Sequence, residues 1–206
     1  CTAGLHGANR LGGNSLVETL VFGRRAGEAA ARFSLERESQ LRSRRAIDEA
    51  HADLDSLIHN GTELSRALQR EVRNVMWEHC GVVREAGDME QALGLLDGVR
   101  AALPHADVRP SEEGWGDLAH VVDVHAMLGT AEATLRGAIA REESRGAHIR
   151  SDFPELDPEM EVNFIIRRGS DAQMALEPAS LPAVSEELRP WLARAGDLDP
   201  AGRLLE

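Results

Sequence analysis

The chain has 206 residues, of which 35 are Asp or Glu and 23 are basic, so its formal net charge is −12. An acidic chain lacks the basic surface with which proteins bind duplex nucleic acid. Mean hydropathy is −0.31, and no run of about 18 apolar residues is present that would cross a bilayer.

Residues 1–14 are small and polar and carry no apolar repeat, which predicts a loop. The chain opens at Cys1 rather than at a methionine, so we expect it to be the C-terminal part of a longer polypeptide. A helix should follow the loop, because Asn14 or Ser15 is a suitable cap. Glu18 stands three residues after Ser15, which is the spacing of a capping box.

The middle of the chain predicts a series of helices. Leu16 and Leu20 begin a stripe that we expect to be packed, and the charged residues 34–59 predict a solvent-exposed linker helix. Three amphipathic helices follow, each with apolar residues at spacings of three and four. Their expected ranges are 62–80, 87–103 and 115–145.

After residue 146 the pattern changes. Asp-Phe-Pro at 152–154 and Asp-Pro at 157–158 break helices. Residues 161–166 predict a short strand with alternating apolar positions. From residue 178 the chain is rich in proline, and we expect irregular backbone there.

The opening loop combines two features that suit an anion. A helix N-terminus offers unpaired N–H groups and partial positive charge. Arg10 precedes it, and its fork of donors fits a carboxylate or phosphate with a charge-assisted hydrogen bond of about 1.5–3 kcal/mol. A glycine-rich turn with a surface arginine is an equally good interpretation of the residues alone.

Residues 6–16 read HGANRLGGNSL and are continued by VFGR at 21–24. This run resembles the motif that closes the FAD domain in the succinate dehydrogenase / fumarate reductase flavoprotein family, which also includes L-aspartate oxidase. REESRGAH at 141–148 and its surroundings resemble the end of the family's C-terminal helical domain. MWEHCGVVR at 76–84 resembles a stretch that lies between these two blocks.

The three blocks follow the family's order and cover most of residues 1–168. The resemblance therefore implies a mainly α chain in three parts. Residues 1–45 would be the end of an FAD-binding domain, a loop plus a helix. Residues 46–150 would be a three-helix bundle, and residues 151–206 an extended C-terminal tail with a short strand.

The resemblance also implies roles for residues of the first motif. Arg10 would bind a carboxylate of the dicarboxylate substrate, and His6 would contact the substrate or the flavin, unless it only bonds to backbone. Ser15 and Leu16 would meet the flavin of FAD, and Asn14 would shape the turn. Arg10 would thereby hold the substrate for hydride exchange between its C–C bond and flavin N5.

Other parts that the family uses do not occur in these 206 residues. They are the arginine that carries the proton, the histidine that bonds FAD covalently in some members, and the Gly-x-Gly-x-x-Gly loop. We therefore assign no catalytic residue and no metal ligand, and expect one wall of a site that needs the missing N-terminal flavin domain. The resemblance further implies a partner that carries iron–sulfur clusters (an iron–sulfur subunit) and contact with a membrane only through partner subunits. We expect a cytoplasmic location, because two cysteines without a disulfide framework suit a reducing compartment.

Two alternatives to a succinate/fumarate enzyme remain. One is a fragment of L-aspartate oxidase, although the pair Gly12-Gly13 favours the dehydrogenase and reductase members. The other is a catalytically inert helical interaction module. We expect Arg145 and His148 to belong to a buried charged network rather than to catalysis, and the three tryptophans to be packing anchors. Cys1 and Cys80 form neither a metal-ligand pattern nor a disulfide framework.

Overall fold

A computed structural model describes residues 14–37, 43–109, 111–169, 173–181, 183–187 and 189–190. The described residues form five α-helices and four short strands, which confirms the predicted mainly α fold. The chain divides into two compact units, Cys1–Met160 and Glu161–Glu206, and each is described by itself. The domain boundaries expected near residues 45 and 150 remain predictions.

The first two helices are α1 (Asn14–Leu35) and α2 (Arg44–Ser56). The helix expected after the opening loop is confirmed, and Ser15 lies in its first turn. The apolar stripe of α1, which was expected to be packed, is exposed among the described residues. Leu16 is 73% and Leu20 75% exposed. None of the residues of α2 is buried, as expected of a solvent-exposed helix.

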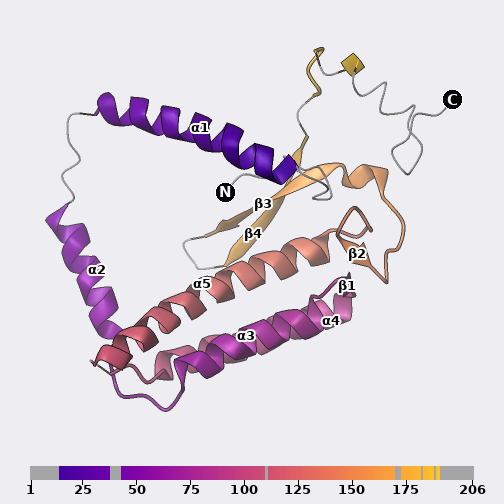
Figure 1. The fold of residues 1–206 in the computed structure, drawn as a ribbon. Helices are drawn as coiled ribbons and strands as arrows, with labels where there is room; N and C mark the ends of the chain where they lie inside the picture. The colour runs from indigo at the N-terminus through magenta and orange to yellow at the C-terminus, as the bar shows by residue number, and fades with distance from the viewer. Residues whose placement is uncertain are drawn as a thin grey trace. The chain divides into compact units, whose positions relative to one another are not determined.

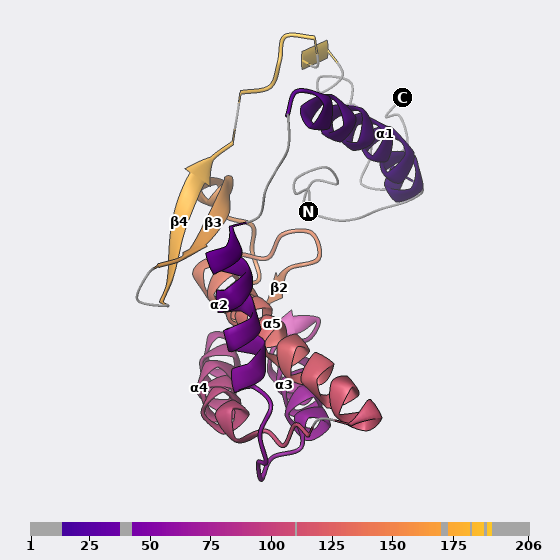
Figure 2. The same cartoon turned by 90° about the vertical axis from the view of Figure 1, so that its left-hand side faces the viewer.

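The predicted three-helix bundle is confirmed. It consists of α3 (Ser65–His79), α4 (Ala86–Ala102) and α5 (Glu112–Ala140), which lie side by side (Figures 1 and 2). Aliphatic side chains fill the space between them, and a fully buried side chain of this size contributes about 1.5–3 kcal/mol. The most deeply buried apolar residues include Val72, Met89, Leu96, Val124 and Leu135.

Two expectations about the bundle are wrong. Trp77 is 82% and Trp115 57% exposed, so these tryptophans do not anchor the core, while Trp191 lies outside the described residues. The last helix ends at Ala140, five residues before the expected end at 145, because the following residues form a hydrogen-bonded loop. None of the described helices combines the length and hydrophobicity that a membrane crossing requires.

The strands form two separate pairs. β1 (Val83–Arg84) runs parallel to β2 (Ile149–Arg150), a pairing that the sequence did not predict. β3 (Val162–Arg168) confirms the predicted strand and forms an antiparallel hairpin with β4 (Met174–Ser180). The irregular backbone expected from Pro178 is therefore wrong up to the end of β4. Proline is tolerated on edge strands, and both strands of a two-stranded hairpin are edges.

The loop between α2 and α3 packs closely against the short 3-10 helix Leu103–His105, which directly follows α4. The amides of Thr62 and Glu63 both donate to the carbonyl of His105, each at 2.9 Å. A Cβ atom on Gly61 would overlap the same carbonyl oxygen. Glycine is therefore required at position 61 by the close approach of the two backbone segments.

We expect Gly61→Ala to lower the free energy of unfolding by about 2 kcal/mol, because the added methyl group forces the loop away from His105. Gly94→Ala is the matched control, since nothing lies within 4 Å of a Cβ added there in α4. It should raise stability by about 0.5–1 kcal/mol. Urea denaturation of both variants measures the difference, and similar values for the two would contradict the close approach.

Candidate functional site

Of the site residues predicted from sequence, Asn14, Ser15 and Leu16 are the first three residues of α1. Arg10 and His6 fall outside the described residues, and of Asn14 only the backbone is described, as the first residue of α1. Ser15 is partly buried and Leu16 is exposed. The first turn contains no acidic residue, so the partial positive charge of this helix end is not neutralised from within the turn.

A second cluster of polar chemistry lies where α5 ends. Side chains from residues 141–152 meet there with a side chain of β1, and we call this cluster the arginine–carboxylate joint. Its members are Arg84, Arg141, Glu143, Arg145, His148, Arg150 and Asp152.

Glu143 is the fully buried centre of the joint. Its Oε1 accepts hydrogen bonds from Arg141 Nη1 at 2.6 Å and Arg145 Nε at 2.7 Å, and its Oε2 accepts one from the Asp157 amide at 3.0 Å. Burial alone raises the pKa of the Glu143 carboxyl, but the three donors outweigh burial and lower the pKa to about 2. Glu143 therefore remains ionised at neutral pH and is not poised as a general acid.

Arg150 is 1% exposed and closes the C-terminal end of α5. Its Nη1 donates to the carbonyls of Ala138, Ile139 and Arg141 at 2.8, 3.0 and 3.1 Å. Ala138 and Ile139 lie in the last turn of α5 and Arg141 directly follows it, and carbonyls at this end of a helix have no donor within the helix. A cation at this position also interacts favourably with the helix dipole.

Asp152 connects Arg150 to the start of α4. Its Oδ1 accepts from Arg150 Nε and its Oδ2 from Arg150 Nη2, both at 2.7 Å. Oδ2 also accepts from the amide of Ala86, the first residue of α4, at 3.1 Å. The hydrogen bonds from Arg150 are the main reason why the pKa of Asp152 lies well below its usual range. The ion pair thus links the C-terminus of α5 to the N-terminus of α4.

His148 connects the same loop to β1. Arg84 Nη1 donates to His148 Nδ1 at 2.9 Å, so Nδ1 carries no proton and Nε2 is the donor to the carbonyl of Arg141 at 3.1 Å. Burial lowers the pKa of His148, and the positive charges of Arg84, Arg150 and Arg141 add to this effect. The imidazole is therefore neutral at pH 7.

A tight turn holds the joint in shape. The amide of Arg145 donates to the carbonyl of His148 at 2.8 Å, and the amide of His148 donates back at 3.0 Å. Gly146 has φ of 60°, a left-handed conformation that favours glycine. The Ser144 hydroxyl accepts from the Arg150 amide at 2.9 Å and donates to the Phe153 carbonyl at 2.9 Å.

The charged members of the joint are hydrogen-bonded to one another or to backbone, which confirms the expected network around Arg145 and His148. The joint fixes the start of α4, the end of α5 and the strand β1. Glu143 is ionised and His148 is neutral at pH 7, so these two groups are not suited to exchange a proton. Sequence reasoning missed the central position of Glu143. The signal that could have found it was its place between two arginines, Arg141 and Arg145, directly after a long helix.

The profile of the family described as fumarate reductase flavoprotein C-term matches residues 69–188, more than half of the chain. The chain belongs to this family. The match covers most of the bundle and every member of the arginine–carboxylate joint, since Arg84 and residues 141–152 all lie within it.

Curated relatives agree with the profile. The fumarate reductase flavoprotein subunit of Serratia sp. is 36% identical over 170 residues, which are 80% of this chain and 28% of that protein. The fumarate reductase flavoprotein subunit of Haemophilus influenzae is 34% identical over 170 residues, again 80% of this chain and 28% of that protein. The chain thus spans less than a third of the length of these relatives.

A solved structure also shares the fold of this flavoprotein C-terminal domain. The structure described as Mycobacterium smegmatis Sdh1 in complex with UQ1 superposes with a TM-score of 0.83 at 27% identity. The match covers 93% of this chain and 33% of that one. The fold that the two chains share therefore extends over most of the 206 residues.

We expect Glu143→Gln to lower the free energy of unfolding at pH 7 by about 3 kcal/mol, because Arg141 and Arg145 lose their buried counter-charge. In the folded wild-type protein the pKa of Glu143 is about 2, below the ordinary 4.5. The ionised carboxylate therefore contributes its full share of the free energy of unfolding above pH 4.5, and this contribution is lost as the pH falls toward 2. The gap between wild type and variant should shrink over that window. The control is Glu142→Gln, at an exposed position, and urea denaturation should show that its free energy of unfolding changes by less than about 0.5 kcal/mol. A gap that is constant with pH would contradict the role of the charge.

His148→Gln tests the neutral imidazole. The glutamine amide retains an acceptor for Arg84 and a donor for the Arg141 carbonyl but does not titrate. The pKa of His148 is lower in the folded state than its ordinary 6.5, so the wild-type protein should lose stability as the pH falls below 6.5. The variant should lose less between pH 6.5 and the lowered pKa. His51→Gln, on the exposed helix α2, should retain the wild-type slope in the same thermal denaturation series.

Proposed function

We propose that this chain is the C-terminal part of a flavoprotein that interconverts succinate and fumarate by hydride transfer to or from FAD. Membership of the family and the names of its relatives support this reaction class. The observation that carries the proposal is the position of α1, whose backbone begins within the HGANRLGGNSL motif, shortly after its arginine.

The start of α1 suits the electron-rich edge of a flavin. A helix of 22 residues begins there, the first N–H groups of a helix have no acceptor within the helix itself, and the first turn holds no acidic residue. Bound FAD would supply the ring that accepts or releases a hydride. Asn14, Ser15 and Leu16 would hold the flavin edge at this helix end, so that N–H donors stabilise negative charge on it.

Arg10 and His6 form the substrate side of the proposal. The guanidinium of Arg10 would bind one carboxylate of the dicarboxylate in a two-pronged hydrogen bond and so orient its carbons over the ring. His6 would contribute a second contact to the substrate. Both residues belong to the motif that precedes α1, and no residue of this chain is assigned the proton transfer.

The remaining parts of the enzyme would come from other polypeptide segments. We propose a flavin-binding domain as the first partner, since the chain spans less than a third of its relatives. An iron–sulfur subunit would exchange electrons with the flavin. The assembly would work in the cytoplasm and would reach a membrane only through further subunits.

We expect Arg10→Ala, made in the complete flavoprotein that carries these residues, to lower kcat/KM for succinate or fumarate by about 10- to 100-fold. Loss of a charge-assisted hydrogen bond of about 1.5–3 kcal/mol predicts this range. Most of the effect should lie in KM, and Arg10→Lys should recover part of it. The control is Arg24→Ala, which removes an exposed arginine that pairs with Glu28 in α1.

Unchanged turnover in Arg10→Ala would refute the proposed substrate contact. Assays of the wild-type protein with succinate, fumarate and L-aspartate separate the alternatives, since turnover of aspartate alone would identify an L-aspartate oxidase. The inert interaction module predicts that the isolated 206 residues bind no FAD, so tightly bound yellow flavin on them would rule that alternative out.

A further inference from the structure

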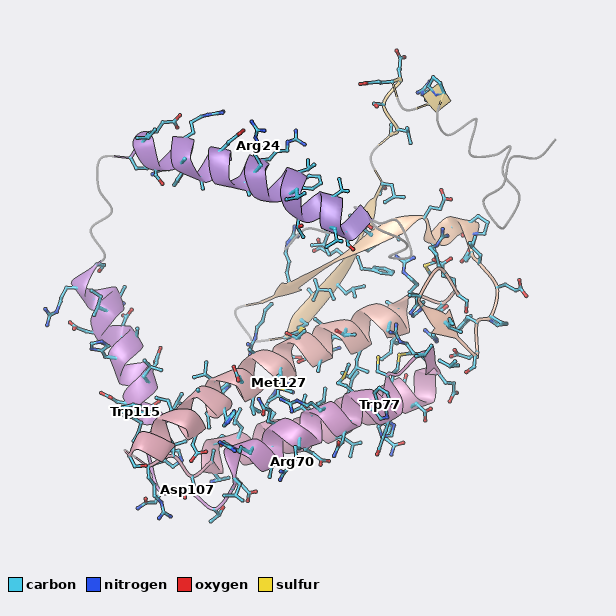
Figure 3. The ribbon with its side chains drawn as sticks, in the orientation of Figure 1. Arg24, Arg70, Trp77, Asp107, Trp115 and Met127 are labelled. Carbon is cyan, nitrogen blue, oxygen red and sulfur yellow. The ribbon has the colours of Figure 1, made fainter. Side chains whose placement is uncertain are left out.

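One face of α3 carries a row of basic residues that ends in a tryptophan. Arg66, Arg70, Arg73 and Trp77 follow one another at spacings of four, three and four, which places them along one side of the helix. All four are exposed, and Trp77 is 82% exposed. Arg70 and Trp77 extend from α3, as Figure 3 shows. We call these four residues the Arg/Trp row.

The arginines of the Arg/Trp row have no ion-pair or hydrogen-bond partner among the residues that the structure describes. On the neighbouring helices, by contrast, Arg100 and Arg136 both pair with Glu132. Within α3 no acidic residue stands three or four positions from any arginine of the row. Their mutual spacing is that of like charges that repel one another on a helix. An acidic counterpart from outside would relieve this repulsion.

An apolar groove runs beside the row, between α3 and α5. Its volume is about 500 Å³, and it is lined mainly by Val72, Met76, Ala126, Met127 and Ala131. Met127 extends from α5 in Figure 3. The lining of the groove is mainly apolar, as is the face that an amphipathic helix packs against a neighbour.

The two rims of the groove have opposite charge. Arg73 of the row lies on the α3 side, and Asp123 lies on the α5 side. Asp123, like Arg73, has no hydrogen-bond partner within the described part of the chain. Thr130 and Thr134, also on the α5 side, donate their hydroxyls to carbonyls of their own helix at 2.9 and 2.8 Å. The rims therefore leave one positive and one negative group open to a partner.

We propose that this surface binds an amphipathic helix of a partner protein. The apolar ridge of that helix fills the groove, its acidic flank faces the Arg/Trp row, and a basic residue on its other flank faces Asp123. The helix completes a four-helix arrangement with the bundle. Trp77 packs against one end of the partner helix, since tryptophan is among the residues that contribute most to binding energy in interfaces. The inference does not depend on the proposed flavin chemistry.

A polyanion such as RNA, or an anionic lipid surface, fits less well. Asp123 stands on the opposite rim, and the chain as a whole carries a net charge of −12, so a uniformly negative partner is repelled outside the row. The apolar groove would also remain unfilled by phosphates. The observations favour a ligand that combines apolar, acidic and basic positions.

The test uses the 206-residue chain and a synthetic helical peptide of about 20 residues with a leucine ridge, a glutamate flank and a lysine flank. Tryptophan fluorescence of the chain and anisotropy of the labelled peptide report binding. We expect Arg70→Glu and Arg73→Glu each to weaken binding at least about tenfold, and added salt to weaken binding to the wild type. Arg44→Glu, on the exposed helix α2, is the control and should leave the affinity unchanged.

Asp123→Arg supplies the decisive comparison. It should weaken binding of the lysine-flanked peptide about tenfold and recover it when the flank facing position 123 is changed to glutamate. Circular dichroism confirms that the exposed substitutions leave the fold intact. The proposal is overturned if the wild-type chain does not bind the peptide, or if Arg73→Glu does not weaken binding. It is also overturned if sedimentation shows a dimer that Arg73→Glu dissociates, or if heparin or phosphatidylglycerol vesicles bind the row in preference to the peptide.

Discussion

The guanidinium of Arg150 satisfies three carbonyls at the end of α5 and binds Asp152, which in turn accepts the first amide of α4. Both helix ends would otherwise present unpaired polar groups to a partly buried environment, where an unpaired group costs about 1–3 kcal/mol. The bundle can therefore place these two ends together only because one ion pair serves both. The buried position of Arg150 is stable for the same reason, since Nε, Nη1 and Nη2 each donate to an acceptor.

The same loop contains the other connections of the joint. Glu143 accepts hydrogen bonds from Arg141 and Arg145, and His148 accepts one from Arg84 on β1. These bonds connect α4, α5 and the short parallel strands at one end of the bundle. This end of the domain is held by charge and hydrogen bonds, whereas its middle is held by aliphatic packing. The Arg/Trp row runs along almost the whole of α3, from Arg66 to Trp77. Val72 and Ala131 belong both to the aliphatic core and to the lining of the groove, so the packing that stabilises the bundle also shapes the surface proposed for recognition.

Much of the architecture could be predicted from the chain itself. Apolar residues at spacings of three and four located α3, α4 and α5, because burial of one helix face imposes that period on any sequence. The ends were less accurate. Ala140 ends α5 earlier than periodicity indicates, because its last carbonyls are satisfied by Arg150, a residue ten positions further along the chain than the end of the helix.

Sequence alone determined the family, through motifs whose residues are contiguous, and the helical class, through a local period. It also indicated that Arg10 binds a carboxylate of a dicarboxylate substrate, and this assignment remains a prediction. Only the tertiary structure decided that Glu143 is buried between two arginines, that Asp152 meets the amide of Ala86, and that Trp77 is exposed. Burial and pairing depend on which distant segments come together, and periodicity along one helix carries no information about the partner that a charged side chain will meet.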